Sequence, residues 1–182
     1  MLFGCVQGLG VRPAIARLAA RLDLAGNVAN RLEGVEILLE GSAQQLDAFE
    51  EVLLTALPKG ARVEGMQRHR ASTTGHNGFR IIEELATGAV RAHIPRDRAT
   101  CDECLSEVAM GSNRRHEYPF TSCTSCGPRY SIIERMPYER VLSGMSGFPQ
   151  CSNCRAEFED PRDRRFHAQT NCCTECGPQH PR

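Results

Sequence analysis

The amino-acid sequence predicts an α+β fold in which a βαββαβ sandwich is followed by a small, irregular zinc-binding domain. Two observations lead to this prediction. Apolar residues in the first half of the chain alternate between the two-residue period of strands and the longer period of helices. The second half carries four C-x2-C pairs that form two matching halves. We therefore divide the 182 residues into a domain at 1–84, a linker at 85–98 and a metal-binding domain at 99–182.

The first domain is expected to open with a strand over residues 1–6. Apolar positions at helical spacing predict a helix over residues 11–22, where Pro13 fits the first turn because an N–H there has no intrahelical partner. Residues 26–32 and 35–39 are extended stretches separated by a Glu-Gly pair, which predicts a hairpin. The opening strand is short, so we expect either a start further upstream or a weakened domain.

A second helix is expected from Ser42, a suitable N-cap, until a Pro-Lys-Gly sequence ends the pattern at residues 58–60. Residues 63–66 form at most a short extended piece, and residues 78–82 are interpreted as the last strand. Two helices then cover one face of an antiparallel sheet, which is a ferredoxin-like arrangement.

The cysteine pairs have the ligand count and spacing of two tetrahedral zinc sites. Each half reads C-x2-C-x18-C-x2-C, and the second half repeats the first at an offset of 50 residues. An Arg-Arg pair and a Cys-Gly-Pro sequence repeat at the same offset, so coincidence is a poor explanation. The modules span 101–126 and 151–176. Four thiolates each predict two structural zinc ions, held by Cys101, Cys104, Cys123, Cys126, Cys151, Cys154, Cys173 and Cys176.

Ten cysteines also permit a disulfide framework, which is typical of exported proteins. The amino-terminus has neither a basic segment nor a long apolar one, so we expect a cytoplasmic protein with reduced thiols. No apolar run is long enough to predict a membrane span. Repeat spacing selects Cys173 as a ligand, although a shift to Cys172 stays open. We expect Cys5 in the core, and His116 and His167 as non-ligands.

The balance of charge argues against nucleic-acid binding. The chain has 22 basic and 22 acidic residues, and the two signs stay nearly balanced in the cysteine-rich half. A zinc ribbon that binds nucleic acid usually carries excess positive charge, because phosphate contacts supply most of its affinity. We therefore expect no nucleic-acid partner. The arginine pairs at 114–115 and 164–165 are expected to be solvated, or paired with nearby acids such as Glu117 and Asp163.

The chemistry of the first domain concentrates on the loop before its first helix. A glycine-bearing loop lets several backbone N–H groups converge, and the helix amino-terminus adds the positive end of its dipole. Arg12 adds a guanidinium fork that suits phosphate oxygens. Alone this signal is weak, because such a loop is more often only a tight turn. The expected phosphate-binding residues are Gln7, Gly8, Leu9, Gly10, Val11 and Arg12.

Residues 4–12, Gly-Cys-Val-Gln-Gly-Leu-Gly-Val-Arg, resemble the G-x-V-Q-G-V-x-F-R signature of acylphosphatases. Residues 26–30, Gly-Asn-Val-Ala-Asn, resemble the second signature of that family, G-x-V-x-N. Val11 and Leu9 are modest departures from the family's phenylalanine and valine. The resemblance implies that the loop binds phosphate, that Arg12 completes the site and that Asn30 orients the attacking water. This expected site has no carboxylate or histidine of its own.

An acylphosphatase-like domain is followed here by two cysteine modules that include the segments 118–130 and 163–169. In this combination the whole chain resembles the amino-terminal region of the HypF family, the carbamoyltransferases of hydrogenase maturation. The resemblance implies carbamoyl-phosphate chemistry, with transfer to a HypE-type partner by two further domains. We expect hydrolysis of an acyl phosphate, with carbamoyl phosphate as the substrate. One alternative is a catalytically incomplete carbamoyltransferase fragment whose zinc module is structural. A zinc-ribbon nucleic-acid binder is a third and weaker hypothesis.

Overall fold

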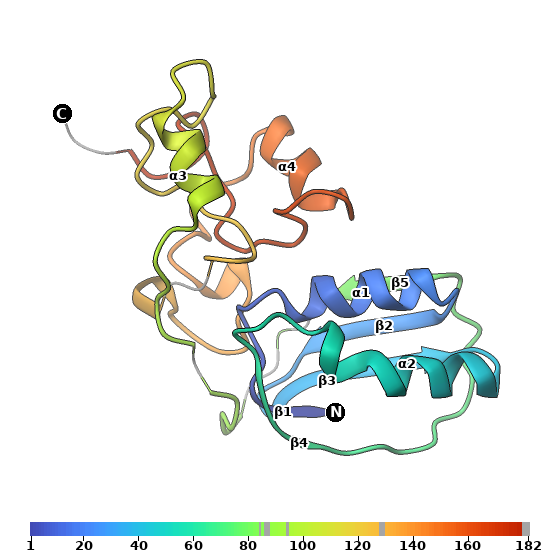
Figure 1. The fold of residues 1–182 in the computed structure, drawn as a ribbon. Helices are drawn as coiled ribbons and strands as arrows, with labels where there is room; N and C mark the ends of the chain where they lie inside the picture. The colour runs from blue at the N-terminus through green and yellow to red at the C-terminus, as the bar shows by residue number, and fades with distance from the viewer. Residues whose placement is uncertain (84, 86–87, 94, 128–129, 180–182) are drawn as a thin grey trace.

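A five-stranded sheet forms the base of the computed structural model, and a lobe that contains both cysteine modules stands at one end of it (Figure 1). The structure describes residues 1–83, 85, 88–93, 95–127 and 130–179. The strand order is β4-β1-β3-β2-β5. The strands are β1 Leu2–Cys5, β2 Ala25–Asn30, β3 Gly34–Glu40, β4 Arg62–Met66 and β5 Phe79–Ile82.

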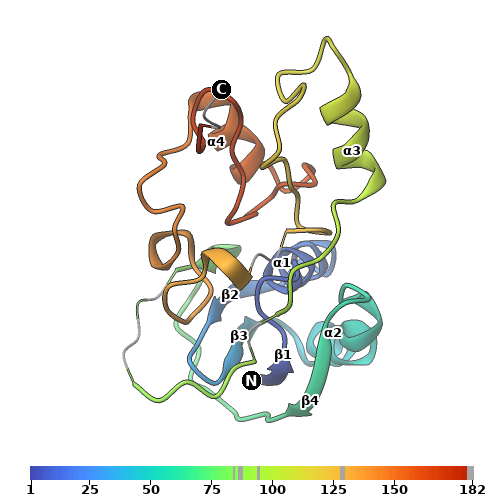
Figure 2. The ribbon, with the colours of Figure 1, turned by 90° about the vertical axis from the view of Figure 1, so that its left-hand side faces the viewer.

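Helices α1, Val11–Arg21, and α2, Ala43–Ala56, lie on the same face of the sheet (Figures 1 and 2). Ser42 is the N-cap of α2, as expected, and its side chain and that of Gln45 form a capping box. The buried side chains between helices and sheet form one core, which contains Leu2, Val6, Leu9, Val11, Ile15, Leu18, Ala19, Leu24, Val28, Val35, Phe49 and Leu53. Cys5 packs against this core.

The α+β fold class is confirmed, but the last strand of the sandwich was assigned to the wrong residues. The strand that closes the βαββαβ unit is β4, which pairs antiparallel with β1. The closing strand was expected at residues 78–82, but residues 79–82 form β5 and pair in parallel with β2 at the opposite edge. Because β4 is an edge strand with alternately half-buried and exposed residues, its apolar signal is weak.

The second lobe is largely irregular and contains two short helices (Figure 2). Each helix begins directly after the first cysteine of its module. These helices are α3, Asp102–Ala109, and α4, Ser152–Glu159; the stretch between the modules contains two short 3-10 helices, Tyr130–Ile132 and Arg140–Leu142. Arg17 of α1 connects the sandwich to the lobe, because its guanidinium donates hydrogen bonds to the carbonyl oxygens of Pro161 and Asp163. Among the described residues, no helix is long and apolar enough to span a bilayer.

Candidate anion site and metal centres

The loop between β1 and α1 needs glycine for its shape and for its neighbours. Gly8 and Gly10 have φ angles of 71° and 77°, in the left-handed region that side chains disfavour. A Cβ atom at Gly8 would lie 3.0 Å from the Pro95 side chain, and one at Gly10 would lie 3.2 Å from that of Thr124. The loop therefore packs against the second lobe, and we call this contact between the sandwich and the lobe the junction. The N–H groups of the first turn of α1, which have no partner within the helix, lie at this junction.

Arg12 and Asn30, the two residues expected to be catalytic, lie together at this junction. Arg12 is in the first turn of α1 and Asn30 is the last residue of β2, and both are buried. Asn30 Nδ2 donates to the carbonyl oxygen of Tyr138 at 2.8 Å, and Arg12 Nη2 approaches the same oxygen at 3.3 Å. Gln7 accepts a hydrogen bond from the Tyr138 N–H at 2.9 Å. The segment between the two cysteine modules thus reaches into the expected phosphate site.

A carboxylate that the sequence analysis missed occupies the guanidinium fork of Arg12. Glu139 Oε1 lies 2.5 Å from Arg12 Nη1, and Glu139 Oε2 lies 2.9 Å from Arg12 Nη2. The Glu139 side chain is fully buried, and its burial raises its pKa to about 7 although Arg12 opposes the change. In the sequence, Glu139 follows Tyr138 without a local motif that would set it apart from a solvated acid.

A histidine from the second module completes the surroundings of the site. His167 lines a cavity of about 30 Å³ together with Arg12 and Asn30. Burial, and then the charge of Arg12, lower the pKa of His167 to about 4, so its ring is neutral at pH 7. The expectation of a site without carboxylate or histidine was therefore wrong, because the cysteine-rich lobe contributes both. His167 lies here and His116 is exposed, and neither belongs to a metal cluster within the described residues.

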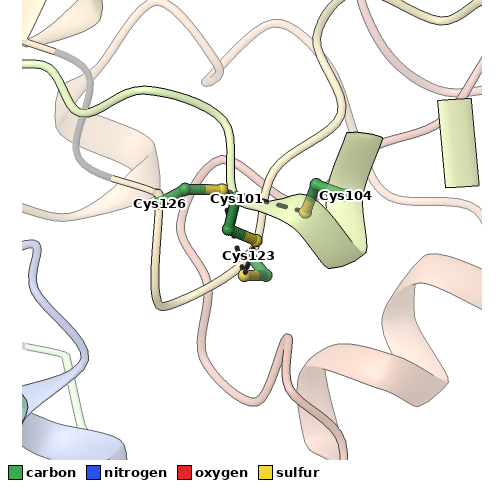
Figure 3. Close-up of side chains that lie close together, drawn as sticks. All are labelled: Cys101, Cys104, Cys123 and Cys126. Atoms are coloured by element: carbon green, nitrogen blue, oxygen red, sulfur yellow. Dashed lines mark hydrogen bonds between the residues drawn. The ribbon is translucent and has the colours of Figure 1, made fainter. Parts of the chain in front are cut away.

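The eight expected ligand cysteines form two clusters in which the sulfur atoms lie within 4.8 Å of one another. In the first cluster, the sulfur of Cys123 lies 3.7 Å from that of Cys101 and 3.9 Å from that of Cys126, and the sulfurs of Cys126 and Cys104 are 3.8 Å apart (Figure 3). In the second cluster, Cys173 lies 3.8 Å from Cys151 and 3.9 Å from Cys176. Four thiolates about 2.3 Å from a tetrahedral zinc ion are spaced by about 3.8 Å, so both clusters fit this metal.

The remaining thiols lie elsewhere. Cys172 is outside the second cluster, and its sulfur lies 3.5 Å from the hydroxyl of Tyr118. All ten cysteines are free thiols in the structure. The sulfur spacings in the clusters are far longer than the roughly 2.0 Å of a disulfide bond, and they favour metal binding over a disulfide framework.

The four paired arginines do not behave as expected, because each pair reaches across to the opposite module. Arg115 donates to Glu157 at 3.0 and 2.6 Å, and Arg165 forms the corresponding pair with Glu107. Within the same pairs, Arg114 donates to the Cys154 sulfur at 3.2 Å, and Arg164 donates to the Cys104 sulfur at 3.0 Å. Glu117 and Asp163 were therefore the wrong partners. We call this reciprocal set the arginine exchange.

The arginine exchange also fits the charge of two zinc sites. A zinc ion with four thiolates carries a net negative charge, and N–H donors to the sulfur atoms stabilise it. Burial alone would raise the pKa of Glu157, but hydrogen bonds from Arg115 and Arg114 outweigh this effect and lower it to about 2. Glu157 is therefore ionised at neutral pH, as its two arginine partners require.

Comparisons with known proteins match both halves of the chain. Residues 1–81 match the acylphosphatase family model, and residues 100–133 and 151–180 match the HypF finger model. The carbamoyltransferase HypF2 of Cupriavidus necator is 44% identical over 150 residues, which cover 81% of this chain and 19% of the relative. The acylphosphatase of Mannheimia succiniciproducens is 37% identical over 84 residues, covering 46% of this chain and 92% of the relative.

Solved structures are similar across both lobes. A crystal structure of full-length HypF in the phosphate- and nucleotide-bound form superimposes with a TM-score of 0.89 and 37% identity, over 98% of this chain and 24% of that protein. The HypF of T. kodakarensis gives a TM-score of 0.82 with 41% identity, over 97% of this chain and 22% of that protein. The chain spans about a fifth of the length of the curated HypF relatives it matches.

Proposed function

We propose an acylphosphatase reaction for this chain, which belongs to the acylphosphatase family through residues 1–81 and corresponds to the amino-terminal region of HypF carbamoyltransferases. Carbamoyl phosphate is the expected substrate. The observation that supports this proposal best is the meeting of Arg12 and Asn30 at the amino end of α1, since an arginine fork, an amide and a helix terminus are donors suited to a phosphoryl group.

In the proposed reaction, the backbone N–H groups of residues 8–12 and the Arg12 guanidinium hold the phosphoryl oxygens. The Arg12 guanidinium is buried, so its positive charge is held in place and shielded from water, and it stabilises the charge that develops in the transition state. The Asn30 amide positions a water molecule for attack on phosphorus. The P–O bond to the carbamoyl group then breaks. Because carbamate is a good leaving group, the reaction needs no strong general base.

The test is release of phosphate from carbamoyl phosphate by the metal-loaded chain. Arg12→Ala removes the fork and should lower kcat/KM by about 100-fold or more, as loss of a charged transition-state donor does. Arg21→Ala is the matched control, because Arg21 is exposed in the last turn of the same helix, and it should leave the rate unchanged. Equal rates for wild type and Arg12→Ala would refute the proposal.

A second role is favoured by the contacts of Tyr138 and Glu139 with Gln7, Asn30 and Arg12, through which the cysteine-rich lobe braces the anion site. In this role the chain holds carbamoyl phosphate as one part of a longer carbamoyltransferase. That protein would act with a HypE-type partner in [NiFe]-hydrogenase maturation. The two roles differ in one measurement: the second expects binding of carbamoyl phosphate without release of phosphate.

We also propose that the two cysteine clusters hold one structural zinc ion each. Cys101, Cys104, Cys123 and Cys126 would bind the first, and Cys151, Cys154, Cys173 and Cys176 would bind the second. Four thiolates complete a tetrahedral zinc shell and leave no position for water, so the metal's contribution is to the fold. Metal analysis of reduced protein should find two zinc ions per chain, and a cadmium- or cobalt-exchanged protein should keep the same stoichiometry.

A further inference from the structure

The Glu139 carboxylate stands where the proposed reaction requires a phosphoryl group. Both of its oxygens lie on the two terminal nitrogens of Arg12, at 2.5 and 2.9 Å. Such a two-pronged pair uses the same donors that an arginine offers to phosphate. Arg12 is therefore fully engaged by an anion that belongs to the protein itself.

The rest of the site is also engaged by the same segment. Asn30 donates to the Tyr138 carbonyl, and Gln7 accepts from the Tyr138 N–H. The cavity that remains, about 30 Å³, has room for roughly two water molecules, which is less than an acyl phosphate requires. Because Glu139 holds both terminal nitrogens of Arg12, binding of a phosphoryl group to that fork requires the Glu139 side chain to give up its place.

The charges around Glu139 do not favour a phosphoryl group and a carboxylate together. Arg12 on α1 is its cationic partner, while Glu83, just after β5, adds a like charge. His167 from the second module is neutral at pH 7, and the Arg140 guanidinium is turned to the carbonyl groups of Gln169 and Phe148. One guanidinium would thus face two adjacent anions in a buried site, which is unfavourable.

We propose that Glu139 is a resident anion that competes with phosphoryl groups for Arg12, a proposal that rests on the proposed function of this loop. Binding of an acyl phosphate is then coupled to uptake of one proton by the Glu139 carboxyl. The proton comes from solvent. The neutral carboxyl then no longer needs Arg12 and can donate an O–H bond to a phosphoryl oxygen. With a pKa of about 7 for this carboxyl, the exchange falls within the physiological range.

The test compares the dissociation constants of inorganic phosphate for zinc-loaded wild type and Glu139→Gln by calorimetry, since the chain has no tryptophan to report binding. Gln keeps the size of the side chain and removes its charge. The ratio of wild-type to variant constants should be near one at pH 6 and roughly tenfold at pH 8, because wild type must there bind a proton as well. The ionisation of phosphate itself is common to both proteins and cancels in the ratio.

Glu134→Gln is the matched control, because Glu134 is an exposed glutamate of the same segment, and the ratio of wild-type to Glu134→Gln dissociation constants should stay at one at both pH values.

A measurement on wild type alone guards against a poorly folded variant. Sulfate has no proton to exchange in this range, so its binding at pH 8, measured in two buffers of different ionisation enthalpy, should take up close to one proton. No proton uptake, or equal phosphate constants for wild type and Glu139→Gln at pH 8, would overturn the proposal.

These results also separate this proposal from the proposed function. If wild type releases phosphate from carbamoyl phosphate while the Glu139→Gln ratio stays at one, the hydrolase stands and the resident anion fails. If the ratio behaves as expected but neither protein releases phosphate, the resident anion stands and the hydrolase fails. A folded Glu139→Gln variant that binds no phosphate overturns the resident anion, because its Arg12 has been freed.

Discussion

Exchange of Arg115 for Met should destabilise one zinc module and leave the other intact. Arg115 is only 2% exposed, and it makes four hydrogen bonds of 3.0 Å or less, to Glu157, Asn171 and the Cys172 carbonyl. Breaking a buried ion pair by removal of one partner costs about 3–5 kcal/mol. Glu157 keeps a second partner, Arg114 at 2.7 Å, so we expect the lower end, about 3 kcal/mol.

The metal site that suffers should be the one that Arg115 contacts across the arginine exchange. Its bonds fall on the second module, where they position the residues around Cys154. Loss of such outer contacts typically lowers metal affinity by about 10–100-fold. Competition with a chromophoric chelator should therefore release one zinc ion early, and alkylation with mass spectrometry should find the newly reactive thiols among Cys151, Cys154, Cys173 and Cys176.

The control is Arg155→Met, which removes an exposed ion pair between Arg155 and Glu159 on α4. Exposed pairs of this kind contribute at most about 0.5 kcal/mol, so the control should resemble wild type. The mirror variant, Arg165→Met, should expose the cysteines of the first module instead. Early alkylation of the first module in Arg115→Met, or equal stability of Arg115→Met and Arg155→Met, would refute this reasoning.

Three further predictions concern the junction and the metals. Gly10→Ala should lower the stability of the chain by about 1–2 kcal/mol in urea unfolding, because of its left-handed φ and the Thr124 contact, whereas Gly111→Ala, with open space around it, should not. The difference in free energy of unfolding between Glu139→Gln and wild type should shift by about 3 kcal/mol in favour of the variant as the pH rises from 4.5 to 7. Over that window the raised pKa of Glu139 makes wild type lose stability as pH rises; a flat difference between the two melting series would contradict this. Cys104→Ser should retain one zinc ion by metal analysis, and retention of two would remove Cys104 from the ligand set.

Much of the sandwich could be predicted because its apolar residues follow the periods of helix and strand. The N-cap at Ser42 and the hairpin of β2 and β3 depend on neighbours in sequence. The closing strand β4 could not be separated from β5 in this way. An exposed edge strand is defined by its pairing partner, here β1, and its own side chains carry little of that information.

The candidate sites also differ in how far apart in the sequence their residues lie. Both cysteine clusters could be predicted because their cysteines lie at short, repeated spacings. Glu139 could not, because it lies 127 residues from Arg12 along the chain, and nothing local distinguishes it from a solvated acid. The arginine exchange escaped prediction for a related reason: a sequence repeat shows that each module has an arginine pair and a glutamate, but not which copy each arginine contacts.

The arginine exchange has the symmetry of a homodimer. Arg115 meets Glu157, while Arg165, its equivalent 50 residues later, meets Glu107, the equivalent of Glu157. Contacts in which each copy gives what it receives define an isologous, two-fold interface. A chain with a single module could form these same contacts only by associating with a second copy. Here both copies lie in one polypeptide, so the two-fold contact forms within the chain, and the stretch that joins the copies carries Glu139.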